Sequence, residues 1–446
     1  MNAVNEQMYA SKDYKRSRWA YKLECTFEYF VTLLVADAFL ATLLSSLGMS
    51  DSMVGIISSI ASLAFLFQLF SVLVAQRIRN TKRFVIIFHT LSQLFFMSLY
   101  FIPFLPFAEK YKHILVFACV LLAYFGNYFV TSIIFKWGNS FVDPHKRASY
   151  SAGKEMISLA SGMVMTIILG WIMDRFEAME NLNGGFIFCA VGILIFSVCD
   201  FVCLLLIKNE IKPKEIVSAS ESKNPSVEKR ATLRMVLKNI MGNRNFRNVV
   251  LLTILWDVAR YTTIGFLGIY RVGAEGLAFT VGAVQVINII GNLGRFLLSK
   301  PFGRFSDKHS FAKGIEVALV LAALAFGVNM FTAPGPLRYL TIAYTLLYSI
   351  SLAGLNQNLY NITYSYVDSE YFVQASAIKN SIGGICGFGA SLAAGKLLEV
   401  IQANGNMLFG IPVHGQQVLS AISFVLLIIA VLFTRFVIGR QKVMIQ

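Results

Sequence analysis

Long apolar stretches recur along nearly the whole chain, and each is long enough to cross a lipid bilayer as a helix. The hydrocarbon core of a bilayer is about 30 Å thick, so a spanning helix needs roughly 20 apolar residues. Backbone polar groups find no water there, and only helices and closed barrels satisfy them internally. The stretches lack the alternation of barrel strands. The sequence therefore predicts an all-α polytopic membrane protein with about twelve transmembrane helices.

The composition agrees with this interpretation. The chain is 56% hydrophobic and 14% charged, and its mean hydropathy is +0.64. The net charge of +15 could indicate nucleic-acid binding, but the basic residues lie in short polar gaps, so we expect no nucleic-acid partner. The six cysteines form no CxxC pair and no His/Cys cluster. We therefore expect neither a disulfide framework nor a metal site, and no cofactor.

One long polar segment divides the apolar stretches six and six. This division predicts an N-terminal six-helix bundle over 1–207, a cytoplasmic linker over 208–247 and a C-terminal six-helix bundle over 248–446. With the N-terminus in the cytoplasm, the cytoplasmic gaps hold most of the 39 Lys and Arg residues. The positive-inside rule then predicts a multi-pass protein of the cell membrane with both termini cytoplasmic. Its basic rim suits anionic lipid headgroups.

Short sequence patterns recur in the two halves. Phe141–Asp143 and the following Ser151–Lys154 are matched, at one and the same shift, by Tyr366–Asp368 and Ser376–Lys379. Internal repeats of this kind are common in transporters, where they produce two pseudo-symmetric bundles. We interpret the halves as homologous.

The gap after the eighth apolar stretch carries a recognisable pattern. Gly303–Lys308 resembles the G-x-L-a-D-R-x-G-R-K signature that stands between helices 2 and 3, and again between helices 8 and 9, of the major facilitator superfamily (MFS). The matching first-half gap, Ala75–Arg83, keeps the basic cluster but has Gln76 in the place of the acid. Asn245–Arg247 is also similar to that family. The resemblance covers the whole chain in topology and implies two six-helix bundles.

The resemblance also implies a conformational latch. An acid at a helix end can accept hydrogen bonds from a neighbouring helix N-terminus and from a basic side chain. We expect Asp307, Lys308 and Arg77 to form this latch, and Gln76 to make it asymmetric. The alternative is that Asp307 and Lys308 are ordinary solvated loop charges.

Several ionisable residues lie within the apolar stretches, where each costs roughly 2.5–3.5 kcal/mol and faces a cavity or a partner. Glu28 and Asp37 lie in the first stretch, and Asp257 and Arg260 lie in the seventh. Asp257 follows Arg247 by about 15 Å of helix, which places it near the midplane. A buried carboxylate suits proton transport because burial disfavours its charged form. We expect Glu28, Asp37 and Asp257 to be proton-coupling residues; a structural ion pair between Asp257 and Arg260 is the alternative.

The resemblance implies that helices 1, 4, 7 and 10 line a central cavity. Their polar residues are amides, tyrosines and one arginine, which supply hydrogen bonds to hydroxyl groups and rings that stack on flat faces. Interhelix hydrogen bonding is the alternative role for these amides. The expected substrate-binding residues are Asn127, Tyr128, Arg260, Tyr261, Asn356, Gln357 and Tyr360.

These observations predict a secondary active transporter. We expect it to move a small polar solute such as a sugar by alternating access, with a proton as the coupling ion. The chain has no P-loop and no catalytic constellation, so we expect no enzyme activity. A drug or metabolite exporter of the same superfamily is the first alternative, although the Gly-x-x-x-Gly-Pro stretch of such antiporters is missing from the fifth stretch. A non-transporting membrane sensor is the second. We expect a monomer among membrane lipids.

Replacing Asp257 with Asn tests the proton-coupling role. The amide keeps the shape of the carboxyl group but cannot exchange a proton, so we expect a folded protein that has lost gradient-driven uptake. Uptake into reconstituted vesicles with and without a proton gradient measures this. Unimpaired uptake by the variant would contradict the assignment.

Overall fold

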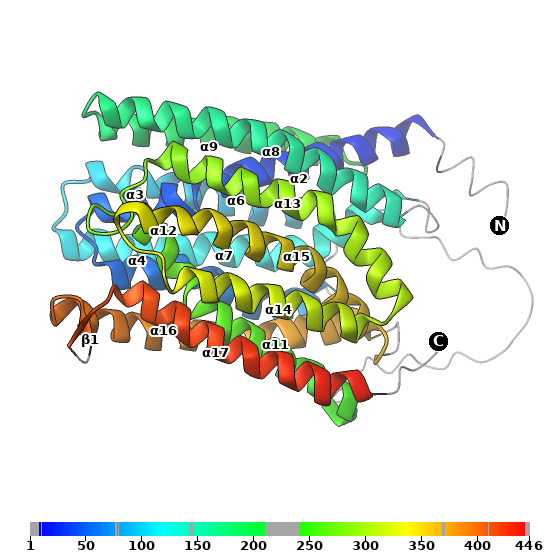
Figure 1. Ribbon diagram of the computed structural model, residues 1–446. Helices are drawn as coiled ribbons and strands as arrows, with labels where there is room; N and C mark the ends of the chain where they lie inside the picture. Colours follow the sequence, from blue (N-terminus) through cyan, green and yellow to red (C-terminus); the bar gives the residue numbers. More distant parts are fainter. Residues whose placement is uncertain are drawn as a thin grey trace, which may run out of the picture.

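The computed structural model describes residues 9, 11–75, 78, 80–142, 147–209, 241–367, 371–408 and 410–441. Within this part of the chain, long α-helices lie side by side with their axes roughly aligned (Figure 1). Nine of these helices are long and apolar enough to cross a membrane, or ten if one bent pair is counted as a span.

The first half supplies six spans, of which the first two are each made of two helices. The described helices are α2 (Lys12–Leu34), α3 (Asp37–Ser46), α4 (Asp51–Ser58), α5 (Ile60–Ala75), α6 (Thr81–Leu99), α7 (Glu109–Asn139), α8 (Arg147–Ala178) and α9 (Leu182–Leu206), with a short 3-10 turn, η1 (Ile102–Phe104).

The second half repeats this plan, and its first span is again broken. Its helices are α11 (Arg244–Tyr261), α12 (Ile264–Val272), α13 (Val281–Lys308), α14 (Phe311–Asn329), α15 (Leu340–Tyr364), α16 (Phe372–Ala403) and α17 (Gly415–Phe436). Two 3-10 turns, η3 (Gly335–Tyr339) and η4 (Ile438–Arg440), and a two-stranded hairpin of β1 (Met407–Leu408) and β2 (Ile411–Pro412) complete it.

The predicted count of twelve spans is consistent with this arrangement. Helices α6 and α15 have 19 and 25 residues, enough to cross a bilayer. Both carry polar residues within the span, including His89 in α6 and Asn358 in α15, which lower their hydropathy. Added to the ten, they make the two pseudo-symmetric six-helix bundles of the expected fold class.

The two ends of the bundle differ. Helix α2 begins and helix α17 ends at the same end, which we call the terminal side; the opposite end, where the β1–β2 hairpin lies, is the far side (Figure 1). Because the described helices alternate in direction, α7 ends and α8 begins at the terminal side, while α12 ends and α13 begins at the far side.

The first span is bent by 41° where α2 gives way to α3. Asp37 begins α3 with a positive φ of 47°, a conformation that non-glycine residues adopt rarely and that Asp tolerates better than most. The break frees backbone carbonyls at the end of α2. One of them, on Leu34, accepts a hydrogen bond from the hydroxyl of Tyr100 in α6.

The halves pack closely at the far side because small residues let their helices approach. A Cβ atom on Gly55 of α4 would collide with the ring of Phe266 in α12. A Cβ atom on Gly265 of α12 would collide with the side chain of Ser59 and with the backbone carbonyl of Gly55. Close contact of this kind is the usual means of holding membrane helices together.

Polar contacts reinforce the same side. Asp37 of α3 accepts a hydrogen bond of 2.7 Å from Asn288 of α13 and lies 3.4 Å from the guanidinium of Arg271 in α12. Asp174 of α8 accepts a hydrogen bond of 2.8 Å from the backbone N–H of Gly282 at the start of α13. The two halves are therefore joined at the far side by both packing and hydrogen bonds.

These contacts place Asp37 differently from the other acids of the first and seventh spans. Its partners are Arg271 and Asn288, on the other half of the molecule and toward the far side. The sequence did not reveal the break in the first span that turns Asp37 toward α12. A role in proton coupling stays a prediction for this residue.

Replacing Gly265 with Val tests whether far-side packing holds the halves together. The larger side chain must push α12 away from α4, so a Cys placed at Ser52, which is buried on α4, should react several-fold faster with a membrane-impermeant maleimide in an otherwise cysteine-free protein. Gly389→Val on α16 is the matched control, since its Cβ would meet no described atom within 4 Å. Equal labelling of the folded Gly265 variant and its parent would contradict the idea.

Candidate functional site

A cavity of about 500 Å³ lies between the two halves, lined by α2, α7, α8 and α13. Its wall extends from mid-span, at α2 and at Arg295 of α13, toward the terminal side, at the end of α7 and the start of α8, so the cavity lies away from the closed far side. Its wall is strongly charged, with Glu28, Lys154, Glu155 and Arg295. Arg295 lies 3.6 Å from Glu155, which joins α13 to α8 across the two halves.

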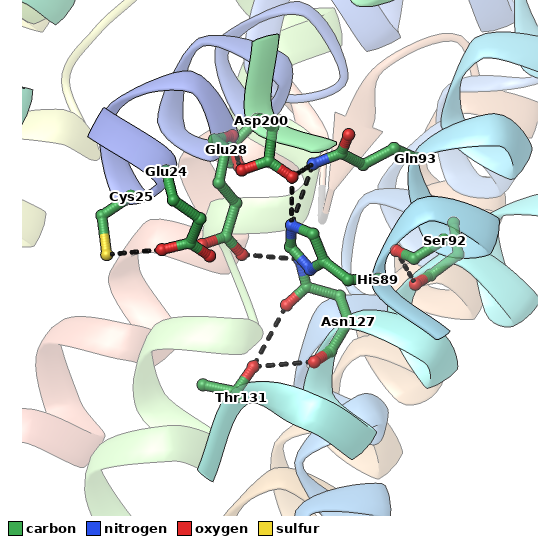
Figure 2. Close-up of polar contacts among 11 residues, drawn as sticks. Glu24, Cys25, Glu28, His89, Ser92, Gln93, Asn127, Thr131 and Asp200 are labelled. Carbon is green, nitrogen blue, oxygen red and sulfur yellow. Dashed lines mark hydrogen bonds and ion pairs between the residues drawn. The ribbon is translucent and has the colours of Figure 1, made fainter. Parts of the chain in front are cut away.

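Glu28 of α2 is held in this wall by a residue that the sequence also singled out. The amide of Asn127 in α7 donates a hydrogen bond of 2.8 Å to the Glu28 carboxylate (Figure 2). The hydroxyl of Thr131 lies 2.8 Å from the Asn127 backbone carbonyl and 3.3 Å from its side-chain oxygen. The amide is therefore oriented with its N–H group toward the acid. The structure brings these two predicted residues into direct contact.

Tyr128, the neighbour of Asn127, reaches toward the second half. Its ring packs edge-on against Phe65 of α5, with centroids 4.9 Å apart. It is close enough to interact electrostatically with Glu28 on its own half and with Arg260 and Tyr261 of α11. Tyr128 therefore stands between the acid of the first span and the charged residues of the seventh.

Arg260 is the centre of a polar and aromatic cluster in the second half. It forms an ion pair of 2.9 Å with Asp257 and donates a hydrogen bond of 3.2 Å to the Tyr261 hydroxyl. Its guanidinium lies 4.5 Å from the centre of the Tyr261 ring and 5.5 Å from that of Trp256. Both arrangements are typical of cation–π contacts. Asp257 and Arg260 thus form the ion pair that the sequence left as one of two alternatives.

Asp257 is only 4% exposed and points toward α16. Its carboxylate lies where a Cβ on Gly383 would be, so only glycine fits at this position of α16. The buried Lys379, one turn earlier on α16, is also within electrostatic reach of the acid. Asp257 is therefore enclosed between α11 and α16. It is not one of the described residues that line the cavity.

Sequence reasoning missed two residues of this cluster. Tyr348 of α15 lies within electrostatic reach of Arg260, and its ring stacks on Trp256 with centroids 6.3 Å apart. Lys379 donates a hydrogen bond of 3.3 Å to Thr363. Lys379 did carry a signal, because it closes the repeated Ser-Ala-x-Lys pattern whose first copy ends at Lys154, a residue of the cavity wall. Tyr348 carried none beyond its place in the tenth stretch.

Three predicted residues of α15 lie apart from Arg260. Asn356, Gln357 and Tyr360 are exposed and come at least two turns after Tyr348, about 12 Å or more toward the terminal side. The Tyr360 ring packs edge-on against Phe372 at the start of α16. The structure does not bring these three residues to the Arg260 cluster.

The expected latch is only partly described. Asp307 and Lys308 lie in the last turn of α13, which continues through the signature as a helix, and both are exposed. Neither forms an ion pair with another described residue. Arg77 lies outside the described residues. The latch remains a prediction.

Comparison with known protein families identifies one match. The family described as Major Facilitator Superfamily matches residues 25–391, which is most of the chain. No curated protein matches the chain by sequence.

Solved structures share the fold. The nucleoside transporter NupG is similar with a TM-score of 0.69 at 12% identity, over 97% of this chain and 100% of that one. A POT family transporter in complex with 5-aminolevulinic acid has a TM-score of 0.63 at 13% identity, over 96% and 95%. A bacterial metal transporter has a TM-score of 0.59 at 12% identity, over 95% and 98%. At such identities the likeness establishes the fold alone.

The Asp257–Arg260 ion pair makes a prediction about stability. Arg260→Met alone leaves the Asp257 charge buried without its partner, so we expect a loss of about 3–5 kcal/mol in the free energy of unfolding. The double variant Asp257→Asn, Arg260→Met removes both charges of the pair, leaves Lys379 as the one buried cation beside it, and should recover part of that loss. Thermal unfolding of the purified variants measures both effects. Equal losses in the single and double variants would contradict a buried ion pair.

Proposed function

Because the chain belongs to the Major Facilitator Superfamily, we propose that it moves a small polar solute across the membrane by alternating access, driven by a proton gradient. Membership makes the chain a multi-pass membrane transporter rather than an enzyme. The solute class, the coupling ion and the direction are our proposals. The observation that carries them is the cavity wall that presents Glu28 with Asn127.

Alternating access needs a closed side and an open route to the site. The far side is closed by glycine-mediated packing and by the contacts of Asp37 and Asp174. The cavity lies in the terminal half. We place the protein in the cell membrane with both termini in the cytoplasm. The conformation described here then receives or releases solute at the cytoplasmic side. The units that rock against each other are residues 1–207 and 248–446, joined by 208–247.

The coupling proton binds at carboxylates that face the solute path. Glu28 fits this role because it is partly exposed on the cavity wall and is fixed by Asn127. Asp257 fits a second role, since neutralising it would release Arg260 to bind the solute. Tyr128, within electrostatic reach of both Glu28 and Arg260, connects the two sites.

The solute is a hydroxyl-bearing molecule with a flat ring face, such as a sugar or a related compound. Asn127, Tyr128 and Tyr261 offer neutral hydrogen-bonding groups and aromatic faces between the halves. Arg260 adds a cation that suits a polar or anionic substituent. Transporters with a similar fold include one for nucleosides, which carry both a sugar and a flat ring.

Uptake measurements with Glu28→Gln test the proposal. A panel of sugars, nucleosides and small peptides is first ranked by thermal shift on the purified protein, and the best ligand is then followed into vesicles. We expect uptake to rise with an inward proton gradient in the wild type, and the variant to lose this response because its amide cannot exchange a proton.

Glu399→Gln is the matched control, because it makes the same change at an exposed acid near the far end of α16. It should behave like the wild type. A Glu28 variant with full gradient-driven uptake would contradict the coupling role, and a wild type that transports no member of the panel would contradict the solute class.

A further inference from the structure

Three titratable side chains meet inside the first bundle, away from the cavity. Glu24 comes from α2, His89 from α6 and Asp200 from α9, and each is at most 1% exposed (Figure 2). The imidazole Nε2 of His89 lies 3.0 Å from an oxygen of Asp200. The amide of Gln93, one turn after His89, donates a hydrogen bond of 2.9 Å to the same oxygen. None of the three titratable residues lines the cavity.

The cluster has unused polar atoms that point to a missing ligand. Glu24 Oε1, His89 Nδ1 and Asp200 Oδ1 are buried, and none has a hydrogen-bond partner among the described residues. Leaving such atoms unpaired inside a protein is costly. From the part of the chain that the structure describes, Glu24 receives only the weak hydrogen bond of the Cys25 thiol, at 3.1 Å.

The charge of the cluster points to the same conclusion. Two carboxylates with a neutral imidazole would carry a charge of −2 in the interior of a membrane bundle, where burial of unpaired charge is strongly disfavoured. Among described residues, no Lys or Arg forms an ion pair with the three. Titratable neighbours within electrostatic reach of the cluster or of Cys25 are Tyr21, Cys25, Glu28, Tyr150, Lys154 and Cys203.

We propose that Glu24, His89 and Asp200 form a second proton-binding site, sealed within the first bundle and linked to the cavity by Glu28. The imidazolium of His89 pairs with the Asp200 carboxylate, and a further proton resides on Glu24, so that the cluster is neutral when loaded. Glu24 and Glu28 are one turn apart on the same face of α2, and Figure 2 draws both acids beside His89. A proton that leaves Glu24 passes to the Glu28 carboxylate and from there to water in the cavity.

A divalent cation is the competing ligand. One ligand atom from each of the three residues lies within 4.8 Å of the others, a spacing that would also suit a metal ion. However, Nε2 of His89 and one oxygen of Asp200 already lie at hydrogen-bonding distance from each other and from Gln93, as expected for a protonated pair. A metal also needs an entry path, whereas a proton needs only Glu28.

Infrared difference spectroscopy of the purified full-length protein, between alkaline and acidic buffer, tests the site directly. A protonated buried acid gives a carboxylic C=O stretching band that a carboxylate lacks. We expect such a band in the wild type, a clearly smaller band in Glu24→Gln, to which only the other protonated acids contribute, and the full band in the Glu399→Gln control. A wild type without the band, or a Glu24 variant that keeps it unchanged, would overturn the proposal.

Two further variants separate proton binding from a merely structural role. His89→Gln removes the imidazolium, so that Asp200 must hold a proton itself and the acid band should grow. Glu28→Gln should keep the band but slow its isotope shift in D₂O, because the route to the cavity is cut. An acid band that does not grow in the His89 variant, or an unaltered isotope-exchange rate in the Glu28 variant, would overturn the corresponding assignment.

Two further measurements complete the test, one of metal binding and one of transport. Zn²⁺ or Mn²⁺ that raised the melting temperature of the wild type but not of Glu24→Gln would identify a metal site and overturn the proposal. The inference rests on the proposed proton coupling, for which Glu24→Gln should abolish gradient-driven uptake while solute exchange at equal pH persists. If the wild type showed no gradient response, proton coupling would fail, and the infrared bands would still decide whether the cluster binds protons.

Discussion

The structure depends on the cost of holding charge inside a membrane. Each acid within a span therefore needs a countercharge or a proton, and the chain supplies a countercharge to three of them in different ways. Asp257 has Arg260 three residues further along the same helix, whereas Asp200 has His89 from another helix of the same bundle. Asp37 has Arg271 from the other half of the molecule. Only the last of these pairs must change when the halves separate at the far side.

The pair between the halves is tied to the packing that surrounds it. Gly268, one turn before Arg271 on α12, lies against the backbone of Asp37, where a Cβ would be 3.0 Å from the carbonyl oxygen. The break that gives Asp37 its positive φ thus sets both the backbone contact and the ion pair. Opening the far side would expose these polar groups to water, which can replace the lost hydrogen bonds. Closure is therefore held by contacts that are reversible.

Hydrophobic runs and internal repeats were enough to predict the helices and the family resemblance, because a bilayer imposes both length and composition. The resemblance implied that helices 1 and 4 line one cavity, but it did not predict that Asn127 donates a hydrogen bond to Glu28. Runs and repeats could not predict the Glu24–His89–Asp200 cluster, whose members come from three helices whose facing sides are set by packing. The polar run of α15 could not show which of its residues lie beside Arg260, for a similar reason: Asn356, Gln357 and Tyr360 lie nearer the terminal side than Tyr348, which carried no motif.

The two lysines that close the repeated Ser-Ala-x-Lys pattern lie in different environments. Lys154 faces the cavity and touches the Tyr21 ring, whereas Lys379 is buried beside Asp257. Two copies of one ancestral segment have therefore diverged, one remaining in contact with water and the other becoming part of a dry interior. In a duplicated architecture of this kind the two copies can take different roles. One copy can exchange ions with water, and the other can bind the solute.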